Sequence, residues 1–299
     1  MIDQCIPTAN DWLYNNTNLG PQQRNAMSDL CPDLFCELPV AGADSGPNTK
    51  PVIIALSGAP GSGKSTLGRM LSAVLTGAGR RCQLLSLDDY YLPLKQRLAL
   101  AEEIHPLCAV RGVPGTHDFS LLLDHLDRLV AGNISGLRTP MFDKATDDRL
   151  PEGKPIQLHA PLDYVLLEGW VCGTPPQLAD ALTEPVNRME AEKDATRVWR
   201  QWVNQNLQDY QTALSSRVQA RWYIQAPDWE AVVRWRWQQE RDLPVAGLKS
   251  IDEIQTFLAH YQRLVQHMQA TSKQWADLII TMDEAHCATM PPDTRSTGQ

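Results

Sequence analysis

One stretch of the chain combines glycines, a lysine and hydroxyl side chains at the spacing of a phosphate-binding loop. It consists of Gly58, Ala59, Pro60, Gly61, Ser62, Gly63, Lys64 and Ser65, followed by Thr66. This satisfies G-x-x-x-x-G-K-[ST], in which the curled backbone directs its N–H groups at phosphate oxygens. Lys64 would place its charge on the β- and γ-phosphates, and Ser65 would offer a hydroxyl to Mg²⁺. The pattern predicts a binding site for ATP with Mg²⁺.

Carboxylates follow two further apolar segments that are predicted to be strands. Asp88 and Asp89 come after the segment that starts at Cys82, and Glu168 closes the segment that starts at Tyr164. Ligands of open α/β sheets bind beyond the carboxyl ends of the strands. Phosphoryl transfer to an alcohol needs a carboxylate for the hydroxyl proton, and Mg²⁺ needs oxygen ligands. We therefore predict Asp88 as the base and Glu168 as a Mg²⁺ ligand, directly or through water. The competing interpretations are a turn or capping pair, and a surface acid.

Strands and helices alternate around these residues. Short apolar runs predict strands over 52–56, 82–87, 164–167, 220–225 and 277–282, and longer periodic segments predict helices over 64–76, 121–130 and 229–241. Alternation of this kind indicates a mostly parallel sheet that is covered on both faces. The sequence thus predicts the three-layer α/β fold of P-loop NTPases, with a five-stranded sheet and helical insertions.

The segments outside this pattern define the expected domain limits. Residues 1–50 are predicted to form a helical extension and a linker that ends in the loop formers Gly42, Ser45, Gly46 and Pro47. The kinase domain would cover 51–286, with a polar helical insertion at about 185–218, and 287–299 would be a flexible tail.

The bulk composition excludes several function classes. The 299 residues carry a formal net charge of −8, which argues against non-specific binding to nucleic acid or anionic membranes. No apolar stretch is long enough for a membrane helix, and the start has no secretory signal pattern. The seven cysteines are odd in number and show no C-x-x-C spacing, which favours reduced thiols and a cytoplasmic location. The oligomeric state is not predicted.

Three motifs in order resemble a known group of kinases. They are S-x-D-x-[FY]-Y at Ser86–Tyr91, P-x-[FY]-D-x₅-R at Pro140–Arg149, and Glu168-Gly169. The chain in this respect resembles the group that contains uridine kinase, phosphoribulokinase and bacterial pantothenate kinase. The resemblance implies that Asp88 is the general base and that Asp143 and Arg149 border the acceptor site.

Within that group, further segments are most similar to the D-glycerate 3-kinases of plants and fungi. The similar segments are His105–Leu107, Arg111–Asp118, the helical insertion Asn187–Tyr210 and Trp235–Glu240. The similarity implies D-glycerate as acceptor and 3-phosphoglycerate as product. The alternatives that stay open are a related kinase of pantothenate, a nucleoside or a sugar phosphate, and a regulatory ATP-binding protein.

Basic side chains in these segments are consistent with a small acidic acceptor. The residues predicted to contact the acceptor are Arg111, His117, Asp118, Asp143 and Arg149, and Lys144 adds a further cation. A guanidinium pairs with a carboxylate through two parallel hydrogen bonds. The competing interpretation is that Arg111 or Arg149 makes a structural salt bridge to Asp118, Asp143 or Asp148.

A helix dense in arginine and tryptophan follows the fourth predicted strand. Arg234, Arg236 and Arg241 are candidates for a lid that neutralises charge on the transferring phosphoryl group. The alternative is a solvated helix face, with Trp235 and Trp237 in the core. Because arginine and tryptophan alternate, the two residue types cannot share one narrow face.

Overall fold

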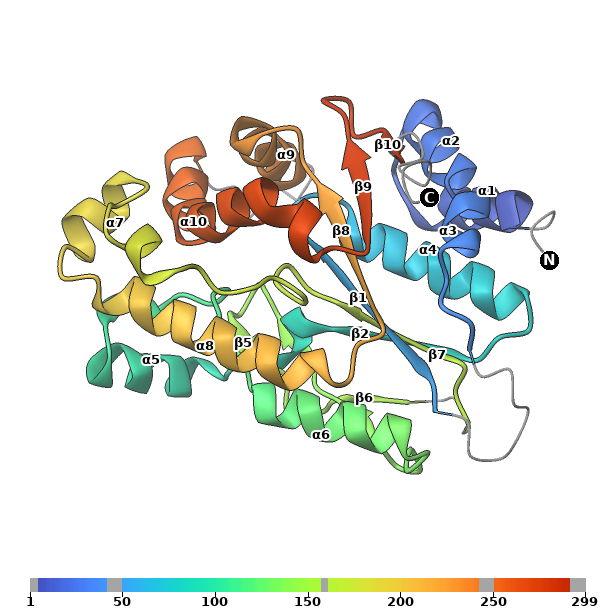
Figure 1. Ribbon diagram of the computed structural model, residues 1–299, viewed down its shortest axis with the longest axis horizontal. Helices are drawn as coiled ribbons and strands as arrows, with labels where there is room; N and C mark the ends of the chain where they lie inside the picture. The colour runs from blue at the N-terminus through green and yellow to red at the C-terminus, as the bar shows by residue number, and fades with distance from the viewer. Residues whose placement is uncertain (1–4, 42–49, 157–160, 242–249, 291–299) are drawn as a thin grey trace, which may run out of the picture.

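The computed structural model describes residues 5–41, 50–156, 161–241 and 250–290. Its centre is a six-stranded sheet in the order β10-β9-β8-β1-β7-β2 (Figure 1). The strands are β1 (Val52–Gly58), β2 (Cys82–Ser86), β7 (Tyr164–Glu168), β8 (Ala220–Gln225), β9 (Leu278–Met282) and β10 (Ala288–Thr289). All neighbouring pairs are parallel except β10 with β9.

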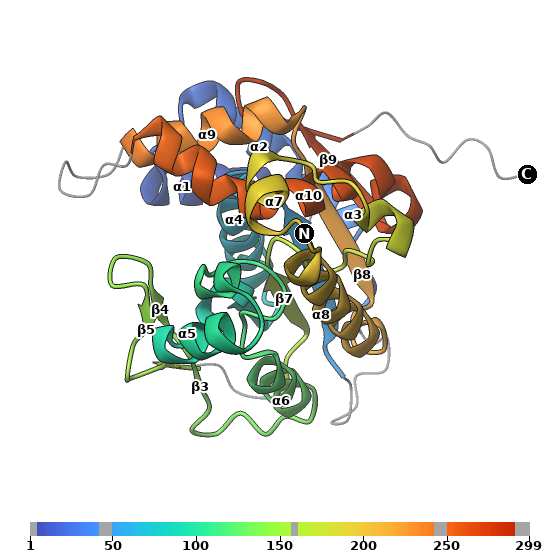
Figure 2. The ribbon, with the colours of Figure 1, turned by 90° about the vertical axis from the view of Figure 1, so that its left-hand side faces the viewer.

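Helices cover both faces of this sheet and give three layers. The α-helices that follow the N-terminal segment are α4 (Lys64–Gly77), α5 (Leu94–Glu103), α6 (Phe119–Val130), α7 (Arg188–Lys193), α8 (Val198–Ser215), α9 (Trp229–Arg241) and α10 (Ile251–Trp275). Short 3₁₀ segments are η2 (Leu87–Tyr90), η3 (Pro106–Ala109) and η4 (Ala179–Leu182). Helix α4 packs against β1, β7 and β2, and α10 packs against β8. Figure 2 shows α5, α7, α8 and α10 toward the viewer, with α4 behind them.

Strand β1 is a buried, mostly apolar strand of the sheet. All seven of its residues are buried, and its sequence VIIALSG is almost entirely apolar, as expected for a strand covered on both faces. The predicted α/β fold is therefore confirmed. The predicted count of five strands is wrong by one, because β10 has only two residues. A strand of that length has no periodicity that a sequence could reveal.

The N-terminal segment is integrated into the molecule. Helices α1 (Cys5–Asn16), α2 (Pro21–Asp29) and α3 (Cys31–Cys36) pack together, with α1 on α4 and α2 on β10. Leu13 and Leu34 are fully buried in the main hydrophobic core. The predicted linker residues 42, 45, 46 and 47 lie outside the described residues, as do tail residues 291–299.

Two small hairpins stand beside the carboxyl end of β2. Strand β3 (Arg138–Thr139) pairs with β6 (Lys154–Pro155), and β4 (Phe142–Asp143) pairs with β5 (Asp148–Arg149). Asp143 closes the turn of the second hairpin, since its carboxylate accepts hydrogen bonds from the Ala145 N–H at 3.0 Å and the Thr146 hydroxyl at 2.8 Å. The next turn residue, Lys144, contacts Asp88 of η2 through its Nζ.

Candidate active site

The phosphate-binding loop lies where the sequence places it, between the end of β1 and the first turn of α4. Lys64 is the first residue of α4, and its Nζ donates to the Ala59 carbonyl at 3.1 Å. Burial lowers the pKa of Lys64, whereas the nearby Glu168 and Asp88 carboxylates raise it. The helix N-terminus and this ammonium both favour an anion at the loop.

Strand register brings Glu168 into contact with two hydroxyls. In the sheet, Glu168 is level with Leu56 of β1 and Ser86 of β2. Its Oε1 accepts hydrogen bonds from Ser65 Oγ at 3.0 Å and from Ser86 Oγ at 2.7 Å. The predicted juxtaposition of the phosphate-binding loop and this acid is thus present in the structure.

Asp88 lies in η2 and has one partner on each carboxylate oxygen. Tyr91 donates its hydroxyl to Oδ1 at 3.0 Å, and Lys144 donates Nζ to Oδ2 at 2.7 Å. Burial by itself would raise the pKa of Asp88, but the ammonium groups of Lys144 and Lys64 hold it well below its usual range. An ionised carboxylate beside a phosphate-binding loop can orient a hydroxyl and take up its proton.

A cavity of about 210 Å³ connects the phosphate-binding loop to these groups. Its charged and aromatic lining residues are Lys64, Asp88, Tyr91, Arg111, Lys144, Trp170, Arg236, Phe257 and Tyr261. Its loop residues are Pro60, Gly61, Gly63, Ser65 and Thr66, with Gln239 at the α9 side. Within the part of the chain that the structure describes, four cationic side chains and one carboxylate therefore line this small cavity.

Arg111 is fixed from several directions at the wall of this cavity. Its guanidinium forms an ion pair with Asp147 and lies over the rings of Phe142 and Phe257, at 5.5 and 6.0 Å from their centroids. Asp147 has a left-handed backbone, with φ of 55°, and is held by the fully buried Arg97 at 2.9 Å. Arg97 thus supports Arg111 through a shared carboxylate.

The other predicted acceptor residues have structural partners. Arg149 pairs with Asp118 at 3.1 Å and donates to the carbonyl oxygens of Tyr90 and Tyr91. Asp118 also caps α6 by accepting from the Leu121 N–H at 3.2 Å. Neither of them lines the 210 Å³ cavity. These contacts fit the salt-bridge interpretation for Arg149.

His117 lies directly behind Tyr91. The two rings stack with centroids 4.6 Å apart, and His117 Nδ1 is 3.2 Å from the Tyr210 hydroxyl. Burial lowers the pKa of His117 to about 4, so the ring is neutral at physiological pH. His117 therefore supports the ring of Tyr91 and does not itself line the cavity.

Helix α9 separates the three predicted lid arginines. Arg236 lines the 210 Å³ cavity and pairs with Glu240 at 2.8 Å. Arg234 pairs with Glu284 after β9, and Arg241 is exposed at the last residue of the helix. Between the first two, the buried Trp235 stacks on His286, whose Nε2 is 3.1 Å from the Gly61 carbonyl oxygen. Arg236 is thus the arginine that faces the phosphate-binding loop.

A second, larger cavity also borders Asp88. It measures about 860 Å³ and extends along β2 and α4 to the β3–β6 hairpin. Glu168 belongs to its lining, and Ser65, Asp88 and Lys144 line both cavities.

Comparisons with known proteins place the chain in a family. A Schizosaccharomyces pombe protein, uncharacterized kinase mug58, is 32% identical over 224 residues, or 72% of this chain and 80% of that protein. The chain belongs to this family of P-loop kinases. The chloroplastic D-glycerate 3-kinase of Arabidopsis thaliana is 28% identical over 243 residues, or 76% of this chain and 51% of that enzyme. The chain thus spans about half the length of the plant relative. No family model matches the chain.

Solved structures agree on the fold of this kinase. A D-glycerate 3-kinase from Cryptococcus neoformans superimposes with a TM-score of 0.66 at 23% identity, and the match covers 98% of each chain. The kinase is an ATP-dependent phosphotransferase with a hydroxyl acceptor. Among the described helices, none is long and apolar enough to cross a membrane.

Several residues of the site were missed by the sequence analysis. They are Arg97, Asp147, Tyr261 and His286, which come from four separate segments. Tyr261 belongs to α10, a helix of 25 residues that the predicted elements omit. Its apolar periodicity and the Ser250–Glu253 capping box would have revealed the helix, but not which side chain reaches the cavity.

Proposed function

We propose that this kinase transfers the γ-phosphoryl group of ATP to a hydroxyl of D-glycerate and forms 3-phosphoglycerate. The observation that carries the proposal is the convergence of Arg111, Lys144 and Asp88 on the small cavity next to Lys64. A carboxylate-bearing alcohol needs a cation for its acid group and a base for its hydroxyl. Similarity to the Arabidopsis D-glycerate 3-kinase supports the same acceptor.

In this proposal, each side chain has a distinct task. Asp88 orients the acceptor hydroxyl and takes up its proton, while Lys64 and Arg236 neutralise charge on the transferring group. Arg111 binds the acceptor carboxylate. Lys144 leaves Asp88 when the hydroxyl arrives, because both would compete for Oδ2.

We propose Mg²⁺ as the metal that accompanies ATP. Ser65 Oγ and the Glu168 carboxylate are hard oxygen donors that contact each other at 3.0 Å, and this donor set fits Mg²⁺. When bound, the ion would neutralise charge on the phosphate oxygens. Glu168 would hold it directly or through water, and the Ser86 hydroxyl fixes the carboxylate rotamer.

The first prediction concerns Glu168. Glu168→Gln should raise the Mg²⁺ concentration needed for half-maximal activity, because one anionic oxygen near the ion is lost while the side-chain shape is kept. A Mg²⁺ titration at constant ATP measures this. Glu192→Gln, an exposed acid on α7, is the control. An identical Mg²⁺ titration for Glu168→Gln and the parent would remove Glu168 from the metal site.

The second prediction concerns the pH dependence. Lys144→Met should move the acid limb of the kcat/KM profile upward by about one to three pH units, because an adjacent cation lowers a carboxyl pKa by that amount. The direction of the shift follows from the pKa of Asp88. With Lys144 present, this pKa is depressed and Asp88 stays ionised at low pH; without Lys144, Asp88 becomes protonated at a higher pH. Activity would then be lost earlier as the pH falls.

The control for this profile is Lys95→Met. Lys95 is an exposed lysine of α5 that loses the same charge and lines neither of the two cavities that Asp88 borders. If both variants keep the parental acid limb, Asp88 is not the group whose protonation limits kcat/KM.

The third prediction tests the acceptor site. Arg111→Ala should raise the KM for D-glycerate by about one to two decades, because a charge-assisted pair contributes roughly 1.5–3 kcal/mol. The KM for ATP should stay nearly constant. Arg111→Lys should restore only part of the affinity, since an ammonium cannot present the planar fork of a guanidinium.

Glycerol is the matched control substrate, because it lacks the carboxylate. It should be a poor acceptor for the parent enzyme and almost insensitive to the loss of Arg111. The same measurements on Arg149→Ala distinguish the roles of the two arginines. Arg149 forms an ion pair with Asp118 and does not line the cavity, so its loss should affect the KM for D-glycerate less than the loss of Arg111. Normal D-glycerate kinetics in Arg111→Ala would overturn the role of Arg111.

The larger cavity favours a second candidate, a bulkier acceptor such as pantothenate or a nucleoside. About 860 Å³ is far more space than a three-carbon acid fills, and Asp88 borders this cavity as well. A coupled assay for ADP release with D-glycerate, L-glycerate, pantothenate and uridine separates the candidates. If pantothenate or uridine is turned over and D-glycerate is not, that compound replaces D-glycerate as the proposed acceptor. ADP release that does not depend on any acceptor would indicate a regulatory ATPase.

A further inference from the structure

The loop from Arg111 to His117 is held by α10 on one side. Tyr261 donates its hydroxyl to the Arg111 carbonyl at 3.2 Å, and Trp170 donates Nε1 to the Gly112 carbonyl at 2.6 Å. Gly112 has φ of +133°, and a Cβ there would lie 1.9 Å from the Tyr261 hydroxyl. The tyrosine therefore occupies the space that a side chain at position 112 would need.

Helix α8 holds the same loop from another side. The Tyr210 hydroxyl accepts a hydrogen bond from the Gly115 N–H at 3.0 Å. A Cβ on Gly115 would lie 2.3 Å from the indole ring of Trp202. At both glycines of the Arg111–Asp118 segment, an aromatic side chain from a helix far along the chain therefore packs directly on the backbone.

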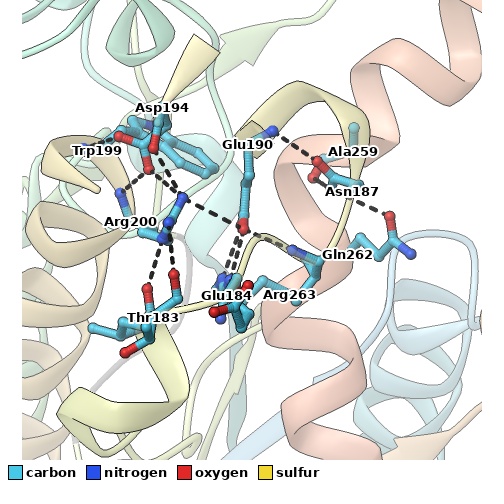
Figure 3. A network of polar contacts seen from close by, with 12 residues as sticks. Thr183, Glu184, Asn187, Glu190, Asp194, Trp199, Arg200, Ala259, Gln262 and Arg263 are labelled. Atoms are coloured by element: carbon cyan, nitrogen blue, oxygen red, sulfur yellow. Dashed lines mark hydrogen bonds and ion pairs between the residues drawn. The ribbon is translucent and has the colours of Figure 1, made fainter. Parts of the chain in front are cut away.

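A buried ion cluster connects the elements that carry these aromatic residues (Figure 3). It consists of Glu190 of α7, Asp194 directly after α7, Arg200 of α8 and Arg263 of α10, none more than 6% exposed. Arg263 binds both oxygens of Glu190, at 2.8 and 2.6 Å. Arg200 binds Asp194 at 3.1 Å and lies 3.9 Å from Glu190.

Both guanidiniums also donate hydrogen bonds to backbone carbonyls of residues 181–184, a segment that precedes α7. Arg263 donates to the carbonyls of Ala181 and Glu184, and Arg200 donates to those of Leu182 and Thr183. Any shift of α8 relative to α10 would leave one of these buried charges without its partner, which is costly. The ion cluster therefore opposes a shift of α8 relative to α10.

We propose that the α7–α8 insertion is a positioning element for acceptor recognition. The ion cluster fixes the position of α8 relative to α10. Trp202 and Tyr210 of α8 and Tyr261 of α10 contact the loop that carries Arg111, so they fix the position of that loop. This positioning role rests on the proposed function, in which Arg111 binds the acceptor. Glu190 is in this sense a positioning residue that acts on the acceptor through two helices.

The test is Glu190→Gln, which keeps the shape and removes the charge. It should raise the KM for the acceptor by roughly 3- to 30-fold. The KM for ATP should stay within about twofold of the parent, because no hydrogen bond or ion pair among the described residues joins the phosphate-binding loop to the cluster. Glu192→Gln, in an exposed pair with Arg188 on the same helix, is the matched control and should change neither constant.

Hydrogen–deuterium exchange supplies a readout that needs no acceptor. In Glu190→Gln, exchange in residues 111–117 should rise while that of 58–66 stays unchanged. If no acceptor in the panel is turned over, the proposed function fails, and the exchange result still decides this inference. Unchanged exchange in 111–117, or an equal rise of both KM values, would overturn it.

A second pair of variants covers the case in which Glu190→Gln does not fold. Tyr210→Phe removes the hydroxyl that binds the Gly115 N–H, and should raise exchange in 111–117 and the acceptor KM. Tyr223→Phe removes a buried hydroxyl that has no hydrogen-bond partner among the described residues and is its control. Indistinguishable behaviour of these two variants would also overturn the proposal.

Discussion

Replacing Lys64 with alanine is expected to abolish measurable phosphoryl transfer while the protein stays folded. Lys64 is the only lysine of the phosphate-binding loop, and it begins α4 at the wall of the small cavity. Removing one preorganised group that stabilises developing charge costs about 10²–10³-fold in kcat, and a full positive charge on the phosphates should exceed that range. Stability should change little, because the ammonium has one backbone partner, the Ala59 carbonyl.

Coupled ADP release measures the activity, and thermal unfolding checks the fold. Lys95→Ala, which removes an exposed lysine of α5, should keep parental kcat and is the control. Full activity in Lys64→Ala would remove the phosphate-binding loop from the mechanism.

Asp88→Asn is expected to lower kcat by about 10²–10⁴-fold and to leave the KM for ATP almost unchanged. The amide keeps the size of the side chain and its contacts with Tyr91, but it cannot take up a proton. Arg111, which binds the acceptor carboxylate in the proposed function, is unchanged in this variant. The KM for the acceptor should therefore rise little, and the loss should fall on kcat.

The neighbouring acid offers a matched comparison. Asp89 accepts a hydrogen bond from the Phe142 N–H at 3.4 Å, and burial raises its pKa, helped by Asp88 and Glu168. Asp89→Asn should reduce kcat far less than Asp88→Asn. If the order is reversed, the base is Asp89. If ATP binding collapses in Asp88→Asn while kcat holds, Asp88 serves the metal or the fold.

The sequence by itself determined the fold class, the phosphate-binding loop and the kinase family. These features are local, because the loop pattern occupies eight consecutive residues and each strand is a short apolar run. It also predicted that Asp88 and Glu168 would lie near Ser65. The physical reason is general: parallel strands deliver their carboxyl ends to one edge, and the register of Ser86 with Glu168 shows it here.

Only the tertiary structure decided which basic side chains face the cavity. Arg111 and Arg149 have the same chemistry and lie in similar segments, yet Arg111 lines the cavity beside Asp147 and Arg149 is bound to Asp118. Arg111 and Asp147 are 36 residues apart, and Asp88 and Lys144 are 56 apart. Spacing along a chain gives the direction of a side chain within one element, but it does not say which distant element packs against that side chain.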